Sequence, residues 1–147
     1  MKENYELIDY VYQDASTGVY KVKKVLETLE NRDNKITGLL KDILNQYEDF
    51  SSQSKRLLEE NNIEVKEESY FSKIWSNMEI NKEIKKDNSD ASIADMMIKE
   101  ISIGHLETCK RLKLEKEDKD REKEHEKLAK QYEKFQHKSI EKLKEYL

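Results

Sequence analysis

The residues best suited to chemistry are three acids and one histidine that lie on or beside the apolar faces of predicted helices. Glu100 and Glu107 are seven residues apart, so two helical turns stack them on one face. His125 lies on an extension of the next helix's apolar face, and Glu48 lies at the border of an earlier one. Carboxylate and imidazole groups are the donors that iron and manganese take in helical bundles. These four residues are therefore the candidate ligands for a metal ion.

A structural role for the same side chains is the competing interpretation. If the last two helices are antiparallel, His125 comes level with Arg111, close to Glu107. Acids paired with arginines fix helix register and need no metal. A di-metal site needs ligands from all four helices, but the first helix has Ala15 at the inward position and Asp14 only at the edge. We therefore favour ion pairs, with no catalytic residue, metal or other cofactor, and keep iron or manganese as the alternative.

Cys109, His105 and His137 lie outside this set of candidate ligands. Cys109 is the only cysteine, and we expect neither an internal disulfide nor a cysteine-based zinc site. Its neighbours in sequence include no identifiable base, so an unreactive thiol is expected. His105 borders an apolar face and His137 points outward, and both are expected to be surface histidines.

The composition points to helices and excludes several other classes of protein. Of the 147 residues, 41% are charged, none is proline and three are glycine. β-Sandwiches and barrels need many Gly/Pro turns, and phosphate-binding loops need clustered glycines, so both are excluded. The net charge of −4 gives nucleic acid little electrostatic attraction. No apolar run is long enough to span a membrane, so we expect one cytoplasmic domain over residues 1–147.

Apolar residues recur at helical spacing over most of the chain. This periodicity predicts four long helices, at residues 4–30, 34–62, 90–114 and 119–146. Gly18 lies inside the first apolar face, where a missing side chain would let another helix come close. Asp33 or Asn34 is the expected N-cap of the second helix. The short link before that helix predicts an antiparallel pair, and together the four helices predict an all-α four-helix bundle.

The connection between the second and third long helices contains a shorter apolar segment. Phe71, Ile74 and Trp75 share one face, which predicts a short fifth helix at residues 69–82. A connection of this length can run from one end of a bundle to the other. Trp75 is expected to cover the core, with a partner-binding surface as the alternative.

This layout resembles the ferritin-like group, in which a long crossover joins two helical hairpins. The resemblance covers nearly the whole chain and rests on the helix with Trp75, on SDASIADMMIKEISIGHLETCKRL (residues 89–112) and on the terminal Tyr-Leu pair. More narrowly, the chain is similar to small uncharacterised and spore-coat-related ferritin-like proteins of Gram-positive bacteria. Di-iron members of the group carry Glu-x-x-His on two helices. Here Ser51 replaces the histidine that would follow Glu48, and the Glu-x-x-His ending at His125 lies near a helix start, so the resemblance implies degenerate di-iron motifs.

These features together predict a non-enzymatic protein with a structural or protein-interaction role. Helices this long, with wide apolar faces, could pair with a second copy, so a homodimer is expected, or a protein partner bound near Trp75. The alternative is a metal-binding ferritin-like redox, storage or stress protein.

Overall fold

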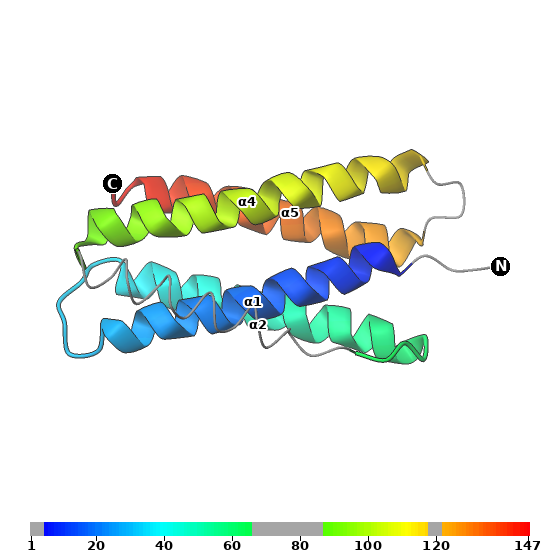
Figure 1. Cartoon of the computed structure of the whole chain (residues 1–147), viewed down its shortest axis with the longest axis horizontal. Helices are drawn as coiled ribbons and strands as arrows, with labels where there is room; N and C mark the ends of the chain where they lie inside the picture. The colour runs from blue at the N-terminus through cyan, green and yellow to red at the C-terminus, as the bar shows by residue number, and fades with distance from the viewer. Residues whose placement is uncertain (1–4, 66–86, 118–121) are drawn as a thin grey trace.

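The computed structural model describes residues 5–65, 87–117 and 122–147 (Figure 1). These residues form no strand and contain four α-helices: α1 (Glu6–Thr28), α2 (Thr37–Glu60), α4 (Asp90–Glu117) and α5 (Lys123–Lys144). The prediction of an all-α fold with four long helices is confirmed for this part of the chain. The predicted helix at residues 69–82, which includes Trp75, lies outside the described residues.

The four helices form two antiparallel hairpins that lie one on the other. Figure 1 shows α1 and α2 joined by a short connection at one end, with α4 and α5 as the second layer. Packing is closest within each hairpin, α1 against α2 and α4 against α5. Between the layers, α5 contacts both α1 and α2, while α4 contacts α1. Among the described helices, none is long and apolar enough to cross a membrane.

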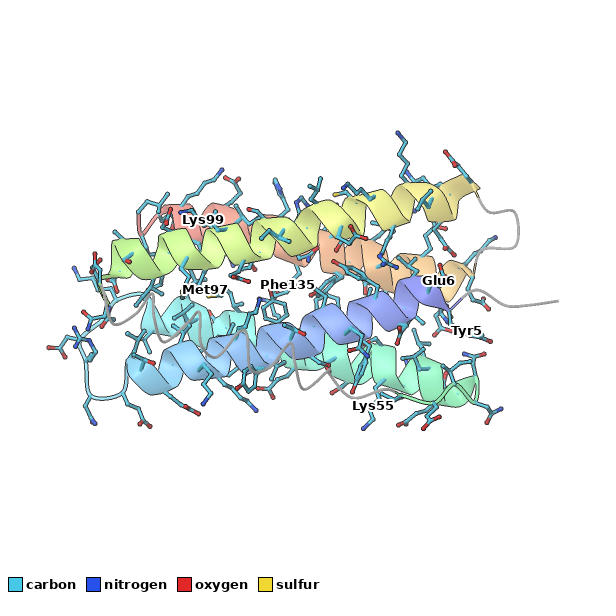
Figure 2. The ribbon with its side chains drawn as sticks, viewed as in Figure 1. Tyr5, Glu6, Lys55, Met97, Lys99 and Phe135 are labelled. Carbon is cyan, nitrogen blue, oxygen red and sulfur yellow. The ribbon has the colours of Figure 1, made fainter. Side chains whose placement is uncertain are left out.

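The core lies between the two hairpins and takes side chains from all four helices. Ile8, Leu40, Ile93 and Leu143, one from each helix, are almost completely buried. In Figure 2, Met97 and Phe135 point into the space between the layers, whereas Lys99 on α4 points away from it. Burying a large aliphatic side chain contributes about 1.5–3 kcal/mol, so this shared core holds the hairpins together.

An aromatic group of Tyr47 and Phe50 from α2 with Tyr132 and Phe135 from α5 fills the middle of that core. The Tyr47 and Phe135 rings meet edge to face with centroids 4.9 Å apart, and those of Phe50 and Tyr132 do so at 5.1 Å. Such edge-to-face pairs stabilise packing beyond the area that they bury.

Gly18 allows α1 and α2 to approach closely, as predicted. A Cβ atom placed at Gly18 would lie only 2.5 Å from the ring of Tyr47. Any side chain at this position would displace the ring, so the glycine sets the distance between the two helices.

The start of α2 differs from the prediction. Neither Asp33 nor Asn34 caps the helix, whose N-cap position is Ile36. Instead the carboxylate of Asp90, the first residue of α4, accepts hydrogen bonds from the backbone N–H groups of Lys35 (3.1 Å) and Ile36 (3.4 Å). The Asn34 side chain also donates to Asp90, at 2.9 Å. A residue from the other hairpin therefore supplies the negative charge that favours a helix N-terminus.

The two helix ends on either side of the charged segment after residue 114 differ from the predicted bounds. The α4 helix continues to Glu117, and α5 begins at Lys123 rather than at residue 119. Lysine and glutamate are good helix formers, and Glu115 is itself buried, so tertiary contacts extend the helix into the charged segment.

Candidate functional site

Two of the predicted ligands, Glu100 and Glu107, lie on α4 but take part in separate ion pairs. Glu100 pairs with Lys21 of α1, and both side chains are mostly buried. Glu107 pairs with Arg111 one turn along the same helix, where Oε1 and Nε are 3.0 Å apart. Both partners of this second pair are more than one-third exposed. Each acid thus has a basic partner, in agreement with the ion-pair interpretation.

The other two predicted ligands lie on other helices than these acids. Glu48 is exposed on α2. His125 is buried near the start of α5, with its ring centroid 5.6 Å from that of Tyr5. In the part of the chain that the structure describes, the four predicted ligands are not brought together as a group of metal donors.

The acid that faces the interior from α1 is Asp14, which the sequence placed only at the edge of an apolar face. Tyr132 of α5 donates a hydrogen bond to Oδ2 of Asp14 at 2.5 Å, and Nε2 of Gln136 donates to the same oxygen at 3.3 Å. The helix α1 packs against α2, α4 and α5, so the surface that it buries is wider than its apolar stripe. The expectation that the first helix offers no inward acid is therefore wrong.

A glycine on α4 makes room for the Asp14 carboxylate. A Cβ atom at Gly104 would lie 3.0 and 3.1 Å from the two carboxylate oxygens of Asp14 and 3.2 Å from Nε2 of Gln136. We call Asp14, Gly104, Tyr132 and Gln136 the Asp14 cluster. It joins three helices, α1, α4 and α5, at one level of the fold.

The same stretch of α4 is tied to α1 by a hydrogen bond from Tyr10. The hydroxyl of Tyr10 donates to the backbone carbonyl of Gly104 at 2.7 Å, and this carbonyl also accepts from Thr108 at 2.8 Å. These contacts hold the backbone of α4 against α1 where no side chain intervenes.

Burial dominates the electrostatics of the Asp14 cluster. Loss of water raises the pKa of the Asp14 carboxyl, and the hydrogen bond from Tyr132 and the positive charge of Lys21 oppose this rise only in part. Burial, together with the nearby Asp14 carboxylate, also raises the pKa of Tyr132 and of Tyr47. The tyrosine hydroxyls therefore keep their protons and act as hydrogen-bond donors at neutral pH.

The space beside Asp14 is too small for a substrate. A cavity of about 30 Å³ lies between α1, α2 and α4, and Asp14, Lys21, Tyr47 and Glu100 are among the residues that line it. Such a volume holds roughly two water molecules. The Asp14 cluster is therefore suited to fixing the relative positions of helices.

One group of metal-type donors is brought together by the tertiary structure, and the sequence analysis did not predict it. Among the described residues, His105 and Cys109 of α4 lie close to Glu133 of α5. Sγ of Cys109 is 3.7 Å from Nε2 of His105, so the thiol has an imidazole neighbour that was not identified in the sequence. The signal that could have revealed it is the four-residue spacing of His105 and Cys109, which places both on one side of a helix.

Comparison of the chain with protein-family models, with curated proteins and with solved structures gave no match.

Proposed function

We propose that this protein is a non-enzymatic interaction module that forms a homodimer through the outer face of α4. The observation that carries the proposal is the exposure of three large aliphatic side chains on this one helix. Ile103, Leu106 and Leu114 are 71%, 58% and 66% exposed. Together they expose on the order of a few hundred Å² of apolar surface along α4, about the size of the largest apolar patch on a typical monomer, which is often functional.

The exposed patch is additional to the side of α4 that packs into the core. Ile93, Met97 and Ile101 are buried and face the other helices. The helix thus carries apolar residues on two sides, although one side would be enough to hold it in this fold. The second apolar side is what supports a role in protein association.

The outer face of α4 is complementary to itself, so a second copy of this chain can bind to it. Ile103, Glu107, Lys110 and Leu114 follow one another at spacings of four, three and four residues. They lie within about 60° on the helix surface, as in an antiparallel coiled coil. A twofold axis near residues 108 and 109 would place Ile103 against Leu114 of the second copy. The same axis would place Glu107 against Lys110 of the second copy, which pairs opposite charges.

A groove beside this face supports the same arrangement. It has a volume of about 370 Å³, lies between the start of α1 and the end of α4, and is lined by Leu7, Glu107, Lys110 and Leu114 among others. The side chain of Ile103 from a second copy would pack against Leu114, which lines this groove. Such a contact buries apolar surface on both copies and is isologous, as in most symmetric dimers.

Sedimentation equilibrium tests the dimer. The wild-type chain is expected to sediment as a dimer, and the double variant Ile103→Glu/Leu114→Glu as a monomer with unchanged helical content. The matched control is Leu147→Glu, because Leu147 is 64% exposed but lies at the C-terminus, outside α4. A wild-type chain that is monomeric at every concentration would contradict the proposal.

Charge reversal tests the antiparallel register. Glu107→Lys should weaken the dimer, because it sets lysine against lysine across the axis. Adding Lys110→Glu should restore the dimer by recreating opposite-charge pairs in reversed order. Failure of the double variant to recover dimerisation would reject this register.

The proposal also includes a ferritin-like relationship and a cytoplasmic setting. Because α2 ends at Glu60 and α4 begins at Asp90, a long connection joins the two antiparallel hairpins. This order supports the relationship, since ferritin-like bundles share it. NMR chemical shifts that show a helix at residues 69–82 would strengthen it, and an extended segment there would weigh against it. A single cysteine, which leaves no partner for an internal disulfide, supports the cytoplasmic setting.

A further inference from the structure

Three potential metal ligands meet between α4 and α5, away from the Asp14 cluster. Nε2 of His105 lies 2.7 Å from Oε2 of Glu133, and the Sγ of Cys109 lies 3.7 Å from the same nitrogen. All three donor atoms lie within 4.8 Å of one another. Cys109 is exposed and the other two residues are partly exposed, so an ion can reach them from solvent.

A fourth donor is next to this group. His137 follows Glu133 by four residues on α5, and its ring centroid is 5.9 Å from that of His105. Each helix therefore offers two donors one turn apart, His105 and Cys109 on α4 and Glu133 and His137 on α5. Two such pairs on adjacent antiparallel helices supply the four ligands of a tetrahedral ion.

We propose that His105, Cys109, Glu133 and His137 form a binding site for one Zn²⁺ ion per chain, which links α4 to α5.

The observed distances among His105, Cys109 and Glu133 fit a zinc ion with small movements of these side chains, and His137 would have to turn toward them. Metal–ligand lengths of about 2.0–2.3 Å place the donors of a tetrahedral site about 3.5 Å apart. The Sγ–Nε2 distance of 3.7 Å is already close to this value. The Nε2–Oε2 distance of 2.7 Å is that of a hydrogen bond. It would widen as the ion takes the place of the shared proton, which passes through solvent to Nδ1 of His105 and leaves the imidazole neutral. His137 is exposed, so its ring can turn toward the ion without disturbing the core.

The chemistry of the donors selects the metal. When the ion binds, the Cys109 thiol releases its proton to solvent and ligates as a thiolate. The thiolate and the Glu133 carboxylate together balance the two positive charges of the ion. One sulfur and two imidazole nitrogens favour zinc over calcium or magnesium, which prefer oxygen ligands. A full set of four protein ligands is typical of a structural zinc site.

Metal titration tests this site. The protein is stripped with a chelator, dialysed and titrated with Zn²⁺ in competition with a chromophoric chelator, and separately with Co²⁺. We expect one ion per chain, a rise in melting temperature with Zn²⁺, and a thiolate-to-cobalt charge-transfer band with Co²⁺. Cys109→Ser should remove this band and weaken zinc binding by at least about 100-fold, since loss of a partner that only orients a ligand already costs 10–100-fold.

The remaining variants distinguish a specific zinc site from nonspecific binding of zinc at the surface. His105→Gln and His137→Gln should each weaken zinc binding. Glu141→Gln, a change in an exposed glutamate on α5, should not weaken it. Circular dichroism of each variant checks that the helices persist. Zinc affinity that is unchanged in Cys109→Ser would overturn the proposal, as would one ion bound per two chains. The stoichiometry should be the same in Ile103→Glu/Leu114→Glu, so the site can be accepted or rejected independently of the proposed dimer.

Discussion

The hydroxyl of Tyr132 on α5 donates a 2.5 Å hydrogen bond to the carboxylate of Asp14 on α1, which joins the two hairpins at the middle of both helices. Gly104 of α4 leaves the space that this carboxylate occupies. A buried acid is costly unless it is paired, so this contact favours one relative placement of the helices over shifted alternatives. The interior of the fold is therefore specified by polar contacts as well as by apolar packing.

The first prediction concerns the pH dependence of stability at Asp14. Burial raises the pKa of its carboxyl, so between the unfolded-state pKa of about 3.9 and the folded-state pKa the folded protein binds more protons. The free energy of unfolding contributed by this group therefore falls as pH rises through that interval. Asparagine cannot ionise, so wild type should lose stability relative to Asp14→Asn as pH is raised from about 4 to 7. Urea unfolding across this pH range measures the difference.

Asp42→Asn is the matched control for this measurement, because Asp42 is exposed on α2. Its stability difference from wild type should stay nearly constant with pH. A difference for Asp14→Asn that is equally flat, or that changes in the opposite direction, would show that the Asp14 carboxyl is not held in a costly buried position.

The second prediction concerns the close approach of α1 and α2 at Gly18. Gly18→Ala would bring a Cβ atom to 2.5 Å from the buried ring of Tyr47, which already packs edge to face on Phe135. We expect a loss of about 1–3 kcal/mol in the free energy of unfolding, as for other overpacked cores. Gly38→Ala is the control, because nothing lies within 4 Å of its Cβ position. That variant should gain up to about 1 kcal/mol from helix propensity, and equal effects of the two changes would contradict the packing at Gly18.

The third prediction separates two candidates for the cap of α2. Asp90→Ala removes the carboxylate that accepts from the N–H groups of Lys35 and Ile36, and it should cost about 1–2 kcal/mol. Asp33→Ala should change the free energy of unfolding by less than about 0.5 kcal/mol, since Asp33 is exposed and does not cap the helix. Chemical denaturation of both variants measures these values. A larger loss in the free energy of unfolding for Asp33→Ala than for Asp90→Ala would support Asp33 as the cap, as predicted from the sequence.

Much of the fold follows from the spacing of residue types along the chain. Period-3.6 apolar patterns predict the four helices because each helix must bury one face. The same reasoning places Gly18 and His125 on or beside apolar faces, and both are buried. Helix ends were predicted less well, because Asp90, a residue 54 positions after Ile36 in the chain, caps the start of α2.

The polar groups of the fold were not predictable in the same way. Asp14 lies at the edge of an apolar stripe, and only the packing of α1 on three neighbours turns that edge inward. Cys109 alone gives no reason to expect a zinc site. The four-residue spacing places His105 beside it, but Glu133 reaches this pair, and His137 reaches His105, only because α4 and α5 pair in one register. Periodicity is a property of one helix and can be read from a single segment. The distance between atoms on two helices depends on how their side chains interlock, which no single segment contains.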